Sequence, residues 1–179
     1  MGFRKLDERI AWTGSLISVG VGRFAGPDGS EFERDVVHHP GAVSVVPVVD
    51  DGEAVLLVRQ YRAAVDRELL ELPAGKRDVD GEAPELTARR ELEEEIGMRA
   101  GRIEKLAEFL NSPGFSDEHS FVYLALDLET CELSAQGIEE QHMTVERVVL
   151  DQVPELIAHG GIEDAKTIIG LCLARQTLR

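Results

Sequence analysis

The chain has 179 residues, enough for one substantial domain, or for one domain with a small second unit, and enough to bury a sizeable core. Its composition, 43% hydrophobic and 30% charged, argues against a disordered or fibrous protein. The formal net charge of -15 argues against nucleic acid and anionic membranes as partners, because no basic surface is left to displace their counterions.

The first third of the chain is predicted to form strands. Residues 15–24 and 31–38, on either side of a "GPDGS" turn, are typical of a β-hairpin, and Trp12 lies just before the first of them. The apolar runs 42–49 and 54–62, joined at "DDGE", predict a second hairpin whose strands are buried on both faces.

The rest of the chain mixes strands and helices. A short strand in "ELLELP" leads into a glycine-rich loop, and a helix follows over 84–96, with Pro84 in its first turn and Gly97 just past its end. The later predicted elements are strands near 102–110, 121–128 and 144–150, then helices near 151–159 and 163–177. This order predicts an α/β (α+β) fold in which helices pack on a mixed sheet.

A break at "HPG" separates the first hairpin from the rest of the chain. We therefore expect residues 1–40 to form an N-terminal β-hairpin subdomain, used for dimerisation or substrate capping, and residues 41–179 to form the main domain. A simple extension of the main sheet explains the N-terminal pattern nearly as well.

The two cysteines, Cys131 and Cys172, lie far apart and have no metal-ligand spacing, so we expect both to be reduced and buried in the core. The N-terminus has no apolar signal segment, and no stretch reaches the ~20 apolar residues of a membrane span. These features predict a cytoplasmic protein with no membrane partner.

The stretch "RRELEEEIG", residues 89–97, concentrates carboxylates on the predicted helix. Glu91, Glu94 and Glu95 fall within an arc of about 100° at the edge of the apolar face, whereas Glu93 points toward solvent. Two half-buried carboxylates about 6 Å apart repel each other by roughly 3 kcal/mol at an effective dielectric constant near 20. A solvated face paired with arginines is the simplest explanation of such a run, and a bound cation is the other.

The longer segment "GKRDVDGEAPELTARRELEEEIGM", residues 75–98, resembles the Nudix box, G-x5-E-x7-R-E-U-x-E-E-x-G-U, in which U is aliphatic. The positions that match are Glu82, Arg90, Glu91, Leu92, Glu94, Glu95, Gly97 and Met98. One departure is that six residues, not five, separate Gly75 from Glu82, so the loop is one residue longer. The resemblance implies a Nudix-type α/β/α sandwich and a hydrolase that acts on a phosphoanhydride bond.

The resemblance also implies a metal site. Magnesium is the expected ion, with Mn²⁺ as a possible substitute, because carboxylate oxygens suit hard divalent cations. Glu91 and Glu95 are the leading metal ligands and Glu94 is the next, with catalytic roles for Glu94 and Arg90. The backbone carbonyl of Ala74 is a further candidate ligand. Arg90 is expected to orient a glutamate through a charge-assisted hydrogen bond. Glu82 is expected to join the same hydrogen-bond network as Arg90 and to be one of the substrate-binding residues.

Three further stretches, "HPGAVSVVPV" (39–48), "VRQYR" (58–62) and "NSPGFSDE" (111–118), look like the ADP-ribose and nucleotide-sugar pyrophosphatase branch of the family. That branch implies hydrolysis of ADP-ribose to AMP and ribose 5-phosphate, and a homodimer. A broader nucleotide-sugar or dinucleotide pyrophosphatase, acting for example on GDP-mannose, is the alternative. A nonenzymatic ADP-ribose sensor is a third possibility, although this chain retains the box glutamates.

The same branch suggests residues that bind substrate. Arg59 and Arg62 offer planar guanidinium groups for phosphate or ribose, or are plain edge-strand charges. Ser116 and Glu118 lie in a turn-rich loop that either closes over the terminal ribose or forms an ordinary surface turn. Trp12 either stacks on adenine, from its own or a partner subunit, or packs in a core or interface.

A general base is still required to accept the proton of the attacking water. Related enzymes take it from an acidic loop before the last strand, which corresponds here to "GIEEQHM", residues 137–143. Glu140 is the first candidate and Glu139 the second.

Overall fold

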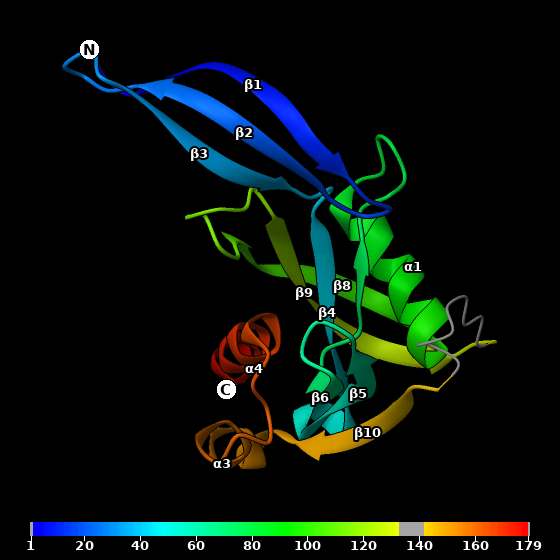
Figure 1. Ribbon diagram of the computed structural model, residues 1–179. Coiled ribbons are helices and arrows are strands. Elements are labelled where there is room, and N and C mark those ends of the chain that lie inside the picture. Colours follow the sequence, from blue (N-terminus) through cyan, green and yellow to red (C-terminus); the bar gives the residue numbers. More distant parts are fainter. Residues whose placement is uncertain (1, 133–141, 179) are drawn as a thin grey trace. The chain divides into compact units, whose positions relative to one another are not determined.

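The computed structural model describes residues 2–132 and 142–178 (Figure 1). Within it the chain forms two compact units. The first consists of Met1–Gly41 with Phe109–His119, and the second of Ala42–Glu108 with Ser120–Arg179. No helix in the described ranges is long and apolar enough to cross a membrane.

The first unit contains a three-stranded antiparallel sheet in the order β1-β2-β3. Its strands are β1 (Arg4–Thr13), β2 (Ser18–Ala25) and β3 (Glu31–His38). The sequence predicted only the last two, so the expectation that Trp12 precedes the first strand is wrong. Register shifts between Lys5 and Asp7 and between Ile10 and Trp12 break the alternation of apolar and polar residues in β1, which removes the usual signal of a strand.

The loop around residues 111–118 is tied to the end of β3. The N–H of Val37 donates to the carbonyl of Phe115 at 2.7 Å, and the N–H of Asp117 donates to the carbonyl of Val37 at 3.1 Å. Beside these bonds, His38 lies between two carboxylates, with Nδ1 against Asp117 and Nε2 3.1 Å from Glu8. Hydrogen bonding to Asp117 and then to Glu8 raises the pKa of His38 above its ordinary value.

The second unit is built on a seven-stranded sheet with the order β10-β5-β4-β9-β8, in which β6 also pairs with β5 and β7 with β4. The strands are β4 (Ala42–Val49), β5 (Ala54–Arg62), β6 (Arg67–Glu71), β7 (Ala74–Lys76), β8 (Met98–Leu110), β9 (His119–Thr130) and β10 (Thr144–Val149). Because β4 runs parallel to β9 and antiparallel to β5 and β7, the sheet is mixed, as the sequence predicted.

Helices cover both faces of this sheet (Figure 1). They are α1 (Pro84–Ile96), α3 (Val153–Ala158) and α4 (Ala165–Thr177), with short 3-10 turns at Asp50–Gly52 and Leu150–Gln152. Val43 and Val45 of β4 share a core cluster with α1, whereas Val46 lies beside Gly170 of α4. Strand β4 is therefore buried on both faces, which confirms the predicted layered fold.

The ends of α1 agree with the sequence prediction. Pro84 occupies its first turn, and Gly97 closes it with a positive φ of 63°. The prediction that both cysteines are buried is wrong: Cys131 is partly exposed and Cys172 is exposed. The buried face of α4 is instead made by Thr167, Gly170, Leu171 and Ala174, so Cys172 turns to solvent.

Candidate active site

The glutamates of α1 lie at the edge of its buried face. Its apolar residues Ala88 and Leu92 enter the core, and the same side of the helix carries Glu91 and Glu95, which are only 7% and 5% exposed. Glu93 points elsewhere and binds Arg99, whose Nε donates at 2.9 Å. The helical periodicity thus places two carboxylates one turn apart in a poorly solvated position.

Arg90 is surrounded by acidic side chains. Its Nη1 donates to Glu94 at 3.1 Å and lies 2.8 Å from Glu91 Oε1, while its Nη2 lies 3.5 Å from Glu82 Oε2 and 3.6 Å from Asp78 Oδ1. Burial lowers the pKa of Arg90, but the charge of Glu91, the hydrogen bond to Glu82 and the charge of Glu94 outweigh it and raise that pKa. Arg90 therefore stays charged and holds this cluster together.

The cluster carries an excess of negative charge. Four carboxylates, those of Asp78, Glu82, Glu91 and Glu94, lie around the guanidinium of Arg90, and Asp78 also lies 3.9 Å from Lys76 Nζ. Among the described residues, no three acidic, histidine or cysteine side chains are arranged closely enough to hold a metal ion as they stand. The donors available are carboxylate oxygens, and their excess charge fits a hard divalent cation. A cavity of about 420 Å³, lined by Arg90, Glu93, Glu94 and Glu132, opens beside the helix.

The backbone of β7 runs directly against the two buried glutamates. The N–H of Ala74 donates to Glu95 Oε2 at 2.8 Å. At the next position, a Cβ on Gly75 would lie 1.9 Å from the carboxyl carbon of Glu91, so any side chain there would require the Glu91 carboxylate to move. The structure thus brings Ala74 to Glu95 through its N–H group, whereas the role of its carbonyl as a ligand stays a prediction.

Glu82 joins the cluster from the preceding loop. Its Oε2 accepts a hydrogen bond of 2.7 Å from the hydroxyl of Thr87, which is fully buried in α1. The loop closes through a 3.1 Å bond from the N–H of Glu82 to the carbonyl of Val79, with Gly81 at a positive φ of 76°. The sequence analysis missed Thr87, although its position one turn before Glu91 on the apolar side of the helix was a usable signal.

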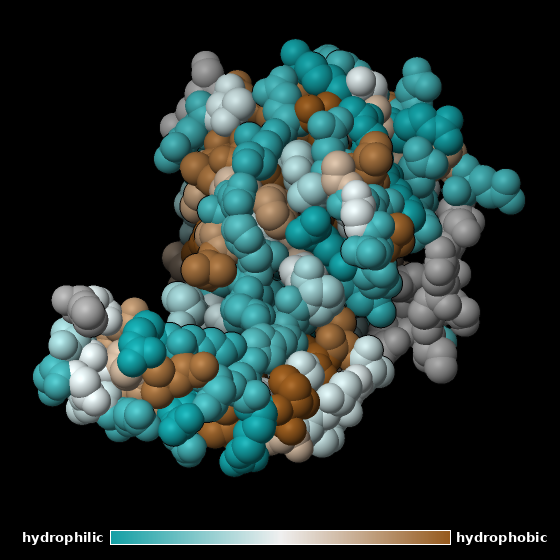
Figure 2. Space-filling model, turned by 90° about the horizontal axis from the view of Figure 1, so that it is seen from above, coloured by the Kyte–Doolittle hydropathy of each residue, from teal (hydrophilic) through white to brown (hydrophobic). Residues whose placement is uncertain are grey.

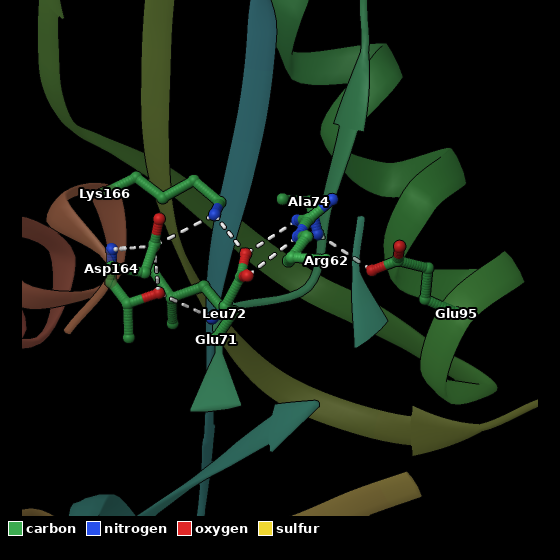
Figure 3. Close-up of polar contacts among 8 residues, drawn as sticks. Arg62, Glu71, Leu72, Ala74, Glu95, Asp164 and Lys166 are labelled. Atoms are coloured by element: carbon green, nitrogen blue, oxygen red, sulfur yellow. Dashed lines mark hydrogen bonds and ion pairs between the residues drawn. The ribbon is translucent and has the colours of Figure 1, made fainter. Parts of the chain in front are cut away.

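Arg59 and Arg62 are separated on β5. Because they are three residues apart in a strand, they point to opposite faces of the sheet. Arg59 donates from Nη2 to Glu146 of β10 at 3.3 Å. Arg62 donates from Nε and Nη2 to the two oxygens of Glu71, at 2.8 and 2.7 Å (Figure 3). That hydrogen bonding raises the pKa of Arg62 despite its burial, and the charge of Glu95 adds to the effect.

Glu71 is the most deeply buried acidic residue near Arg62, and the sequence analysis did not single it out. It is 1% exposed and is bonded by Arg62 and by Lys166 of α4. Burial raises the pKa of Glu71, but the Arg62 hydrogen bond and the Lys166 charge outweigh it, so that its pKa lies below the ordinary value. The surrounding sequence "ELLELP" is typical of a strand, and nothing in it indicates that Glu71 is buried between two cations.

The other predicted site residues lie in the first unit or outside the described ranges. Trp12 of β1 is 55% exposed. The hydroxyl of Ser116 accepts a 3.2 Å hydrogen bond from the N–H of Glu118, whose carboxylate lies 4.0 Å from His39. The two base candidates, Glu139 and Glu140, lie outside the described residues.

Comparison with known proteins supports the assignment made from the residues. Residues 38–168 match the family model of the NUDIX domain. A relative from Bacillus subtilis (strain 168), named ADP-ribose pyrophosphatase, is 39% identical over 156 residues, which are 87% of this chain and 83% of the relative. A relative from Mycobacterium tuberculosis (strain ATCC 25618 / H37Rv) with the same name is 36% identical over 169 residues, which are 94% of this chain and 81% of the relative.

A solved structure shows the same fold. The structure titled "Crystal structure of ADP compounds hydrolase" matches with a TM-score of 0.86 and 23% sequence identity, and the match covers 99% of this chain and 95% of that one.

Proposed function

Because the chain belongs to the NUDIX family, we propose that it is a metal-dependent pyrophosphatase that hydrolyses ADP-ribose, with one water, to AMP and ribose 5-phosphate. The observation that carries the proposal is the pair of buried carboxylates, Glu91 and Glu95, held against the backbone of β7 beside an arginine that is outnumbered by acidic groups. The names of the two bacterial relatives support the choice of substrate.

The chain's own residues have distinct tasks in this proposal. Glu91 and Glu95 hold the ion, with Glu94 and the carbonyl of Ala74 as further ligands. Arg90 orients the glutamates through the contacts described above. Mg²⁺ is the proposed ion and Mn²⁺ its substitute, since both accept oxygen ligands. When bound, such an ion polarises the phosphoryl group and makes water a better nucleophile.

The remaining tasks are substrate recognition and proton transfer. Arg62 and Arg59 offer cationic groups for phosphate or ribose, and Glu82, which accepts from Arg90, is proposed to act with Arg90 on the substrate side. Trp12 is proposed to stack on adenine. Ser116 and Glu118 are proposed to bind the terminal ribose. Glu140, or else Glu139, is proposed to accept the proton from the attacking water.

A homodimer is the proposed assembly. The first unit exposes large apolar side chains, and Figure 2 shows such brown side chains at the surface among hydrophilic ones. The exposed fractions are 71% for Phe3, 55% for Ile10 and Trp12, and 45% for Leu16. A partner that covers them would remove apolar surface from water. Sedimentation of the purified protein tests this assembly. A cytoplasmic location stays a prediction.

The function is tested by incubating the purified protein with ADP-ribose, GDP-mannose and NADH side by side, with Mg²⁺ and again with a chelator. We expect AMP and ribose 5-phosphate from ADP-ribose at the highest kcat/KM, and no turnover in the chelator. A higher kcat/KM for GDP-mannose would move the protein to the nucleotide-sugar alternative. Tight binding of ADP-ribose without turnover at any metal concentration would make it a sensor.

A further inference from the structure

The segment Glu71–Ala74, which joins β6 to β7, lies between two helices from distant parts of the chain (Figure 3). The backbone N–H groups of Leu72 and Ala74 in this segment both donate to side chains of helices. The N–H of Leu72 donates to Thr167 of α4 at 2.9 Å, and the N–H of Ala74 donates to Glu95 of α1 at 2.8 Å. Pro73 between them has no N–H, and its carbonyl accepts from Val45 at 2.9 Å.

Thr167 fixes the segment to the start of α4. Its side chain is fully buried, and its hydroxyl accepts from Leu72 and donates to Asp164 at 2.6 Å. Asp164 is the N-cap residue and also accepts from the N–H of Thr167 at 2.9 Å. Since the hydroxyl bonds on both sides, Leu72 is held at a set position relative to the first turn of α4.

A second tie from α4 reaches the same segment. Lys166 forms an ion pair with Glu71, and its Nζ lies 2.9 Å from Asp164. A carboxylate as buried as that of Glu71 is tolerated only with charged partners, and Arg62 and Lys166 supply them. Both Glu71 and Leu72 are therefore held in place by residues of the first turn of α4.

At the other end of the segment, Ala74 fixes one oxygen of Glu95. Hydrogen bonds to a ligating carboxylate set its orientation and its affinity for a metal ion. We propose that Thr167 and Lys166 are positioning residues for Glu95, which they orient through the Glu71–Ala74 segment without touching substrate or ion. The proposal rests on the proposed function, because it takes Glu95 to be a metal ligand.

The competing explanation is that the first turn of α4 only stabilises the fold. Three variants separate the two explanations. Thr167→Val keeps the shape of the side chain but removes the hydroxyl, and Thr167→Ser restores it. Ala174→Gly weakens the same helix about two turns further on, away from the segment. Lys166→Gln removes the ion pair with Glu71 and replaces Thr167→Val in the test if that variant does not fold.

Two readouts apply at a temperature where all variants are folded: hydrogen exchange of the Ala74 amide, followed by NMR, and Mn²⁺ binding to the substrate-free protein. For Thr167→Val and Lys166→Gln we expect Mn²⁺ affinity to fall by about tenfold. We also expect the Ala74 amide to exchange at least about tenfold faster in both. Thr167→Ser and Ala174→Gly should stay within about twofold of the wild type in both readouts.

Unchanged Ala74 exchange and Mn²⁺ affinity in Thr167→Val, with a melting temperature lowered as in Ala174→Gly, would overturn the proposal. The amide readout needs neither ion nor substrate, so it tests the positioning even where the enzyme is inactive. A wild-type protein that binds no Mn²⁺ would instead refute the proposed function.

Discussion

Gly75 of β7 lies so close to Glu91 of α1 that a Cβ at this position would fall 2.2 and 2.3 Å from its carboxylate oxygens. Such separations are well inside van der Waals contact, so the Glu91 carboxylate can occupy its observed position only because position 75 has no side chain. The glycine thus sets how near the carboxylate lies to the backbone of β7.

Gly75→Ala is therefore expected to push Glu91 out of place. We expect kcat to fall by about a hundredfold, because displacements near 1 Å have such effects on positioned groups. Steady-state kinetics with ADP-ribose measure the effect. Gly101→Ala is the matched control, because its Cβ meets Asp127 no closer than 3.1 Å, and it should keep most of the activity. Equal losses in both variants would mean that any alanine in these strands is harmful.

Glu95→Gln is expected to remove most activity while leaving the fold intact. The amide is isosteric and can still accept from Ala74, but it binds a divalent ion weakly, so a drop in kcat of at least about a hundredfold is expected. Its melting temperature should match or exceed that of the wild type, because one repulsive charge is gone. Glu85→Gln, which alters an exposed pair with Arg89 on the same helix, is the control. Full turnover by folded Glu95→Gln would remove Glu95 from the metal site.

Glu140→Gln is expected to lower kcat by about a hundredfold with little change in KM, because a general base acts in the transition state. Glu139→Gln is the control, and its kinetics should stay near those of the wild type. The reverse outcome would assign the base to Glu139.

The buried Glu71 makes stability depend on pH in a defined direction. Its pKa in the folded protein lies below the ordinary 4.5, so its contribution is complete above that value and is lost as the pH falls through the folded pKa. Glu71→Gln should cost about 3 kcal/mol at pH 7, because Arg62 and Lys166 lose a buried partner.

Urea unfolding of Glu71→Gln and wild type from pH 7 down to pH 3.5 measures this. The difference in unfolding free energy between the wild type and Glu71→Gln should become smaller toward pH 3.5. Glu163→Gln, which alters an exposed pair with Arg67, should change stability by no more than about 1 kcal/mol. A difference in unfolding free energy that is independent of pH would mean that folding does not shift the pKa of Glu71.

His38 gives the first unit the opposite pH dependence. Its folded pKa is raised above 6.5 by Asp117 and Glu8, so its stabilisation is complete below 6.5 and is lost as the pH rises through the folded pKa. His38→Gln should therefore destabilise the protein more at pH 6 than at pH 9. Fluorescence of the single tryptophan, Trp12, reports on the unit directly. His159→Gln, which removes an exposed ring whose Nδ1 lies 2.9 Å from the carbonyl of Glu155, is the control substitution.

The parts of the molecule that follow from periodicity were predictable from the sequence. The strands 42–49 and 54–62 and the helix 84–96 were predicted with their observed bounds, because apolar runs and a Pro and Gly at the helix ends mark them. The depth of Glu91 and Glu95 also followed from helix geometry. Strand β1 did not, because its bulges shift the alternation on which such predictions depend.

The polar ties across the fold were beyond prediction from one sequence. Thr167 and Leu72 are 95 positions apart, and nothing in either local pattern shows that they will meet. Glu71 reads as an ordinary strand residue until the structure shows two cations around it. Local patterns specify elements, whereas the partners of buried polar groups depend on how the elements pack.

The distance in sequence between Glu71 and Lys166 affects how the protein is made. Synthesis from the N-terminus delivers Glu71 together with Arg62 first, and Lys166, its second cationic partner, leaves the ribosome 95 residues later. Until then the strand end cannot bury its carboxylate beneath α4. The nascent chain must therefore reach α4 before Glu71 has both of its cationic partners, and a message that stops short of Asp164 yields a product in which Glu71 lacks Lys166.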